Sequence, residues 1–212
     1  STLSGDEQGI ILGQLCNTLQ PCRAMYFSSA SSELWVLLTL AVRQQLRADY
    51  EAAAALCVKV GLRSCKELRE ATKIRWYDLG LSTVDLSTLG TLGSVLPALE
   101  ELWLNQTSGA AGLDGVQQLA AGLAAGALPR LVFLALRNMH VGEAGASALA
   151  AALDRGALLR LKILALTRAA INDAALVALA PALRRLPALE ELDLWGNLFG
   201  DEGLAALVAP PP

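Results

Sequence analysis

The chain has 212 residues, of which 54% are apolar and 17% are charged, and its net charge is −3. A composition this apolar, with so few charges, is typical of a packed protein and excludes a disordered one. The 17 lysine and arginine residues are scattered along the chain. The sequence therefore contains no basic patch of the kind that would indicate a nucleic-acid partner.

Two features of the N-terminal part bear on location. The first residues, STLSGDEQG, carry Asp6 and Glu7 but no lysine or arginine, which argues against a secretory signal and against a transit peptide. The longest strongly apolar run, residues 34–42, is far shorter than the ~20 residues that a membrane span needs. We therefore expect a core helix there, no membrane span, and an intracellular, cytoplasmic protein.

Residues 1–70 do not repeat, and their apolar residues follow a helical period, which predicts a small helical N-terminal cap region. Asp49 is a candidate N-cap for a helix through the following alanines, and Gly61 is the expected stop signal. Ser64 and Glu67 have the spacing of a capping box for the next helix.

All four cysteines, at positions 16, 22, 57 and 65, lie in this region. Zinc sites use tighter pairs such as C-x-x-C, so these gaps fit a metal poorly. Disulfides stay open as an alternative, but nothing else indicates secretion, and buried reduced thiols are favoured. We expect no metal and no cofactor.

A six-residue pattern, L-x-x-L-x-L, recurs four times in the rest of the chain. The copies are LEELWL at 99–104, LVFLAL at 131–136, LKILAL at 161–166 and LEELDL at 189–194. A degraded copy places Ala71, Ile74 and Trp76 at the three apolar positions, and Trp76 is expected in the core. The sequence thus predicts a repeat domain over residues 71–212, with units that start at residues 71, 99, 131, 161 and 189.

The last two leucines of each pattern are two residues apart, so they point to the same face of a strand. An apolar helix follows each strand, and repeated crossovers in one direction make a parallel sheet. Strands stack about 4.8 Å apart, whereas helices need roughly 10 Å, so the sheet should line the concave side. Pro181 falls inside the fourth helix and is expected to bend or divide it.

These units resemble the leucine-rich repeat family, in its ribonuclease-inhibitor-like subclass, which also forms NOD-like receptor sensor regions and the Ran GTPase-activating protein scaffold. The clearest match is LEELDLWGNLFGDEGLAAL, residues 189–207. The resemblance implies an α/β solenoid with a concave parallel sheet and convex helices. The family asparagine of the turn is present only as Asn197, so we expect differently bonded turns in the other units, where the position holds Leu79, Thr107, Met139 and Ala169.

Little in the sequence indicates catalysis. His140 is the one histidine, and none of the usual nucleophile, zinc-protease or phosphate-loop motifs accompanies it. Asp201 and Glu202 are adjacent, but acidic residues at that place favour the start of a helix. We expect no catalytic residues and no enzyme.

Strand residues that point away from the core should form three columns across the sheet. They are Lys73, Glu101, Phe133, Ile163 and Glu191; Arg75, Trp103, Ala135, Ala165 and Asp193; and Tyr77, Asn105, Arg137, Thr167 and Trp195. Large aromatic residues and arginine dominate the energetics of protein interfaces. The candidate protein-binding residues on this concave face are Tyr77, Trp103, Phe133, Arg137, Ile163, Arg168, Asp193 and Trp195.

The sequence therefore favours a non-catalytic scaffold that binds a protein partner through the concave face. One alternative is a structural subunit of a large multi-protein assembly, which the high apolar content favours. Another is an F-box-like adaptor, in which the N-terminal helices and the repeats bind different partners. The leucine–proline opening of an F-box is missing from this chain.

Overall fold

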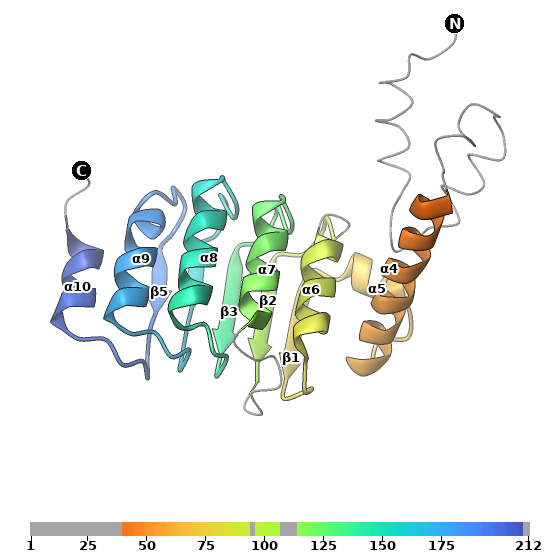
Figure 1. Ribbon diagram of the computed structural model, residues 1–212, viewed down its shortest axis with the longest axis horizontal. Coiled ribbons are helices and arrows are strands. Elements are labelled where there is room, and N and C mark those ends of the chain that lie inside the picture. The colour runs from red at the N-terminus through yellow and green to blue at the C-terminus, as the bar shows by residue number, and fades with distance from the viewer. Residues whose placement is uncertain (1–39, 94–95, 107–113, 210–212) are drawn as a thin grey trace, which may run out of the picture. The chain divides into compact units, whose positions relative to one another are not determined.

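The computed structural model describes residues 40–93, 96–106 and 114–209 (Figure 1). The chain divides into two compact units, Ser1–Lys66 and Glu67–Pro212. The expected boundary between the helical region and the repeat domain was residue 70. The second unit contains the whole sheet and is the part that bears on function.

In the first unit, α4 (Leu40–Lys59) is one helix. The short helix α5 (Cys65–Glu70) spans the boundary between the two units. The prediction that Asp49 caps a separate helix is wrong: Asp49 lies inside α4 and accepts a hydrogen bond from Gln45 Nε2 at 2.7 Å. No proline or glycine occurs in α4, so nothing in its sequence interrupts the helix. Gly61 follows the helix with a φ of +75°, as a stop signal should.

Two of the four cysteines lie within the described residues. Cys57 and Cys65 are both buried, and their sulfur atoms are 3.8 Å apart, too far for a disulfide between them. The predicted burial of the cysteines is confirmed for these two. Cys16 and Cys22 lie outside the described residues.

The second unit alternates strands and helices from beginning to end. Its strands are β1 (Lys73–Tyr77), β2 (Glu101–Asn105), β3 (Phe133–Arg137), β4 (Ile163–Ala165) and β5 (Glu191–Asp193). Its helices are α6 (Thr83–Leu92), α7 (Asp114–Ala124), α8 (Gly142–Asp154), α9 (Asp173–Arg184) and α10 (Asp201–Val208). Every strand begins two residues after the start of a unit in the sequence.

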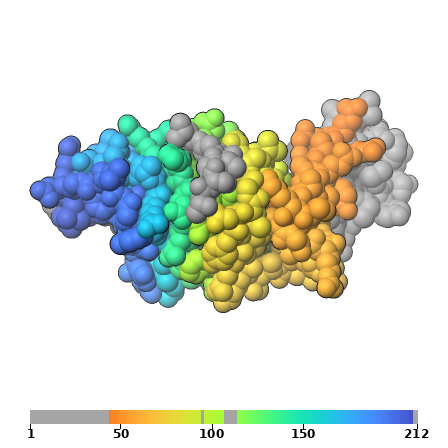
Figure 2. Space-filling model, turned by 90° about the horizontal axis from the view of Figure 1, so that it is seen from below, coloured from red at the N-terminus to blue at the C-terminus, as the bar shows by residue number. Residues whose placement is uncertain are grey.

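The five strands form one parallel sheet in chain order, β1-β2-β3-β4-β5. Helices α6 to α10 lie along one face of this sheet, and each packs against the next (Figure 1). In the space-filling view, the same part of the chain forms successive bands of colour from yellow to blue (Figure 2). The prediction of an α/β fold with a parallel sheet is confirmed.

The strand register agrees with the predicted columns. Lys73, Glu101, Phe133, Ile163 and Glu191 are successive partners, and so are Arg75, Trp103, Ala135, Ala165 and Asp193. The third column runs partly beyond the strand ends. Backbone hydrogen bonds continue there, for example from the Asn138 amide to the Thr167 carbonyl and from the Arg168 amide to the Trp195 carbonyl.

The core lies between the sheet and the helices. The inward leucines of β2 and β3 are buried, at 0 to 1% exposed, and Trp76 of β1 is 5% exposed, so its prediction as a core residue is confirmed. In the fifth unit, Leu192 and Leu194 are only half-buried.

Pro181 was expected to bend or divide its helix, and the structure excludes the division, because α9 is continuous through Pro181. A proline inside a helix removes one backbone hydrogen bond and crowds the preceding turn. Pro181 itself is exposed. Packing of α9 against both α8 and α10 compensates for the lost bond.

Turns after the strands are bonded in different ways, as predicted. The Asn197 side chain accepts hydrogen bonds from the amides of Ala169 and Ile171, at 2.9 and 3.0 Å, and donates to the carbonyls of Leu166 and Leu194. One unit earlier, where Ala169 replaces the asparagine, its backbone carbonyl accepts from the Val141 amide instead, at 3.0 Å. Thr107 lies outside the described residues.

In the turn after β1, a side-chain amide that the leucine pattern does not identify accepts a backbone hydrogen bond. Gln106 is 1% exposed, and its Oε1 accepts a hydrogen bond from the Leu81 amide at 3.0 Å. Leu81 stands at the same place in its unit as Ile171, and Gln106 precedes by one residue the position that Asn197 holds in the fifth unit. Gln106 replaces Asn197 only in part, because its buried Nε2 donates to no atom of the described residues.

Candidate functional site

The sheet face opposite the helices carries the candidate site. The outward side chains of β1, namely Lys73, Arg75 and Tyr77, are exposed, and those of β2 are half-buried. Ala135 and Ala165, in the middle column, are buried although they point outward. Their small side chains leave space over β3 and β4 into which larger neighbours lean.

Trp103 and Phe133 form an aromatic pair on this face. Their ring centroids are 4.1 Å apart, and the ring planes meet at 18°, so the rings are stacked. Trp103 pairs in register with Ala135, whose short side chain lets the indole lean from β2 toward β3. Both rings stay partly exposed, and Ile163 is the partner of Phe133 in the next strand. Trp103, Phe133 and Ile163 therefore form a partly exposed apolar patch on this face.

Two arginines lie over the Trp103 ring, each with its guanidinium carbon 5.4 Å from the ring centroid. Arg75 comes from β1 and Arg137 from β3, so the indole is flanked from both neighbouring strands. Cation–π contacts of this geometry stabilise the position of a guanidinium while its N–H groups stay free to donate.

Glu101 of β2 is the carboxylate on the part of the face near β1. Its oxygens lie 2.6 Å from Lys73 Nζ and 3.4 Å from an Arg75 nitrogen. The hydrogen bond from Lys73 is the main cause that holds the pKa of Glu101 below its ordinary value of 4.5, and burial acts in the opposite direction. The Glu101 carboxylate is thus the ion-pair partner of both Lys73 and Arg75.

Asp193 has the corresponding role at the other end. It accepts hydrogen bonds from Thr167 Oγ1 at 3.1 Å and from the Trp195 amide at 2.9 Å. Arg137 lies 3.7 Å from the same carboxylate. Asp193 is therefore oriented by two short hydrogen bonds, and its ion pair with Arg137 is long.

Arg168 packs on Trp195 after the end of β4. Its guanidinium carbon is 4.6 Å from the Trp195 ring centroid. Gly196 makes room for this contact, because a Cβ there would lie 2.7 Å from Arg168 Cγ. Arg168 itself has a φ of +50°, a left-handed conformation that costs energy for a residue with a long side chain.

The structure brings most of the predicted residues into one connected set: Trp103, Phe133, Arg137, Ile163, Asp193, Trp195 and Arg168. Tyr77 lies at the edge strand and is 47% exposed. Arg75 and Glu101 belong to the same set but were not among the candidates. They stand in the predicted columns next to Trp103, and that proximity was the signal that could have identified them.

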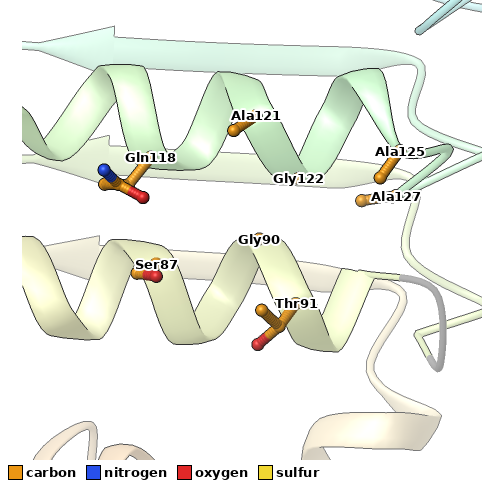
Figure 3. A pocket seen from close by; sticks show the side chains of 8 residues that line it. All are labelled: Ser87, Gly90, Thr91, Gln118, Ala121, Gly122, Ala125 and Ala127. Carbon is orange, nitrogen blue, oxygen red and sulfur yellow. The ribbon is translucent and has the colours of Figure 1, made fainter.

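A shallow groove of about 350 Å³ lies on the helical side, between α6 and α7 (Figure 3). Gly90 and Gly122 approach each other there, since a Cβ on Gly122 would come within 2.4 Å of Gly90 Cα. The groove is a consequence of this close packing, because small residues line it: Ser87, Gly90, Thr91, Ala121, Gly122, Ala125 and Ala127, together with Gln118.

The described residues offer no metal-binding cluster around the one histidine of the chain. His140 is an exposed turn residue. Within residues 40–93, 96–106 and 114–209, no three histidine, cysteine or acidic side chains gather closely enough to hold a metal ion. No helix among those residues is both long and apolar enough to cross a membrane.

Comparison with known proteins gave no match to any family model and no match to any curated protein sequence.

Proposed function

We propose that this chain is a leucine-rich repeat protein of the ribonuclease-inhibitor-like type, and that its repeats form a curved solenoid. The recurrence of L-x-x-L-x-L at each strand supports this assignment. The in-order parallel sheet, with one helix after each strand, supports it as well. So does the Asn197 side chain, which bonds four backbone groups of two adjacent turns.

The function that fits best is non-catalytic binding of a protein partner through the open sheet face. The observation that carries it is the partly exposed Trp103–Phe133 stack with Arg75 and Arg137 over the indole. Tryptophan and arginine, clustered near the centre of a surface and held in place, are characteristic of interface hot spots. A second tryptophan, Trp195, is 63% exposed on the same side.

A cytoplasmic location belongs to the same proposal. Cys57 and Cys65 are buried, and their sulfur atoms lie 3.8 Å apart with no disulfide between them. Thiols this close persist in a reducing compartment, whereas an oxidising one favours their pairing. Free-thiol titration of the unfolded protein, purified without reductant, measures their state.

The test is a binding comparison between the wild type and Trp103→Ala/Phe133→Ala/Trp195→Ala. The matched control removes exposed apolar side chains from α6, from the turn before β4 and from α9, with Val84→Ala/Leu159→Ala/Val177→Ala. Each protein is first compared with the wild type by circular dichroism and thermal unfolding. Each is then used as bait in a lysate, and captured proteins are quantified by mass spectrometry.

We expect captured partners to be lost from the sheet-face variant and kept by the matched control. Partners that persist on the folded sheet-face variant, or that are lost equally from the control, would exclude the sheet face as the main contact. Because hot-spot truncations cost about 2 kcal/mol or more each, the loss should exceed tenfold.

A second candidate function, a permanent subunit of a larger assembly, is favoured by the exposed apolar residues of the fifth unit. Leu198 is 85% exposed, Leu204 is 51% exposed and Val208 is 76% exposed. For this candidate, the chain expressed alone should self-associate with increasing concentration in analytical ultracentrifugation. A Leu198→Gln/Leu204→Gln/Val208→Gln variant should then stay monomeric. A wild type that is monomeric at all concentrations argues against an obligate subunit.

A further inference from the structure

Three arginines and two tryptophans form a continuous series across the sheet face. Arg75 and Arg137 both lie over Trp103. Arg137 reaches toward Asp193, whose carboxylate holds the Trp195 amide, and Arg168 lies over the Trp195 ring. The guanidinium groups are thus held on aromatic rings from β1 to the turn after β4. Because these side chains are already ordered, they lose less conformational entropy when a ligand binds.

The carboxylates of the face do not neutralise these cations. Among the described residues, Arg75 shares Glu101 with Lys73, and Lys73 has the shorter contact, 2.6 Å against 3.4 Å. Within residues 40–93, 96–106 and 114–209, Arg137 has only the 3.7 Å pair with Asp193. Arg168 lies within ion-pair distance of no carboxylate in the part of the chain that the structure describes, although its guanidinium is exposed.

The backbone around Arg168 is shaped for this placement. Its φ of +50° costs energy, and the missing side chain of Gly196 leaves the space through which the Arg168 side chain passes. The same left-handed conformation occurs at the corresponding positions Asp78, Asn138 and Gly196, so the geometry of the turn sets it. At Arg168 this turn directs a long cationic side chain onto the Trp195 ring.

We propose that the partner bound by this face presents an extended acidic segment whose carboxylates pair with Arg168 and Arg75, while an apolar side chain packs on the Trp103–Phe133 stack. This inference rests on the proposed function. Guanidinium groups bind carboxylates through paired N–H donors, so arginines held on rings are suited to discrete acidic side chains. The face spans five strands, about 19 Å, which an extended segment of about six residues covers.

A peptide fits this face better than a nucleic acid does. Glu101, Asp193 and the exposed Glu191 lie among the arginines, and the whole chain carries a net charge of −3. The evenly spaced phosphates of a nucleic acid would be repelled by these carboxylates. A peptide, by contrast, can place acidic residues opposite the arginines and apolar residues between them.

The experiment uses a displayed library of random decapeptides, selected on the immobilised full chain at low salt. Enriched peptides are synthesised, and their affinities are measured by fluorescence anisotropy. The test variant is Arg75→Gln/Arg168→Asn, since asparagine tolerates the left-handed backbone at position 168. The matched control, Arg130→Gln/Arg155→Gln, removes the same charge from two exposed arginines, ahead of β3 and at the end of α8.

We expect the enriched peptides to carry two or more aspartate or glutamate residues beside an apolar one. Their affinity should fall at least tenfold for the test variant and stay within twofold for the control. Neutral or basic enriched peptides, or acidic ones that bind the test variant equally well, would overturn the inference. Tighter binding of a single-stranded oligonucleotide than of these peptides would overturn it too.

A Trp103→Ala/Phe133→Ala variant distinguishes the two levels of failure. If neutral peptides are enriched and this variant no longer binds them, the sheet face remains the binding surface and only its preference for acidic segments is wrong. If no peptide is enriched, or the enriched ones bind this variant as well as the wild type, the inference and the proposed function both fail.

Discussion

At the scale of single residues, the same place in four of the units has the same backbone conformation, although the side chain there differs. The eighth residue of the first, third, fourth and fifth units has a positive φ; these residues are Asp78, Asn138, Arg168 and Gly196. Glycine, asparagine and aspartate adopt this conformation readily. Arg168 does so at a cost, and it is the one of the four whose side chain lies on an exposed tryptophan.

The Asn197 side chain is expected to contribute strongly to stability. In Asn197→Ala, the Ala169 and Ile171 amides and the Leu166 and Leu194 carbonyls each lose a partner. We expect the free energy of unfolding in urea to fall by about 2 to 4 kcal/mol.

Asn197→Asp is the control for this prediction, because it keeps the acceptor for the two amides and loses the two donors. It should lie between the wild type and the alanine variant. An alanine variant within 0.5 kcal/mol of the wild type, roughly the range of ordinary surface substitutions, would contradict the role given to Asn197.

The Glu101 carboxylate makes a pH-dependent contribution to stability. Because Lys73 holds the pKa of Glu101 below 4.5, the contribution is complete above that value and is lost as the pH falls through the lower pKa of the folded state. In Lys73→Met, the pKa of Glu101 should rise toward 4.5, measured by NMR titration of its side-chain carboxyl carbon. An unchanged titration midpoint would show that Lys73 does not set it. Lys162→Met, which removes a partner of Glu190, is the control.

At the scale of elements, α9 keeps a proline in its interior without being divided. Pro181→Ala should restore the missing backbone hydrogen bond and remove the crowding, and it changes little else because position 181 is exposed. We expect the free energy of unfolding to rise by about 1 to 3 kcal/mol, measured in urea. Pro187→Ala, after the helix end, is the control and should give no comparable gain. A destabilised Pro181→Ala protein would contradict this account.

The contact between α6 and α7 depends on two facing glycines. A Cβ at position 122 would come within 2.4 Å of the Gly90 backbone, whereas one at position 90 would meet its nearest atom at 3.2 Å. Gly122→Ala should therefore lower the free energy of unfolding by about 1 to 3 kcal/mol, although alanine favours a helix. Gly90→Ala should cost less. Equal effects of the two substitutions in urea denaturation would show that helix spacing is not set at Gly122.

At the scale of the whole sheet, burial of the inward leucines declines from β2 and β3 toward β5. Leu102, Leu104, Leu134 and Leu136 are at most 1% exposed, whereas Leu194 is half-buried. Amide hydrogen exchange reports local opening, which is easiest where few apolar contacts must be broken. We expect β2 and β3 amides to exchange slowest and β5 amides fastest in a mass-spectrometric time course. Uniform protection across the five strands would contradict this gradient.

Much of the fold could be predicted from the leucine pattern. Two leucines, two residues apart and followed by an apolar helix, fix which face of each strand is buried, and the repeat then fixes the register of neighbouring strands. The columns of outward residues followed directly. The effects of Asp49 and Pro181 were harder to predict. The capping tendency of Asp49 is outweighed by the long helix that surrounds it, and the helix-breaking tendency of Pro181 is outweighed by packing on both sides of α9.

The candidate site was predictable only in part. The sequence indicated which residues point outward, so Trp103, Phe133 and Trp195 could be named. It did not indicate how these side chains are oriented on the sheet. Their orientation depends on the size of the residues on neighbouring strands, such as Ala135 beside Trp103. The roles of Arg75 and Glu101 and the buried amide of Gln106 emerged from the same kind of cross-strand contact.

The sequence by itself determined the alternation of strands and helices, the parallel sheet and the identity of the outward columns, because these depend on periodicity within one chain segment. Only the tertiary structure decided that Arg75 and Arg137 flank one indole, that Asp193 connects Arg137 to Trp195, and that Gly196 leaves room for Arg168. Each of these contacts joins residues from different units, and its geometry depends on side-chain volumes that meet only after the strands are side by side.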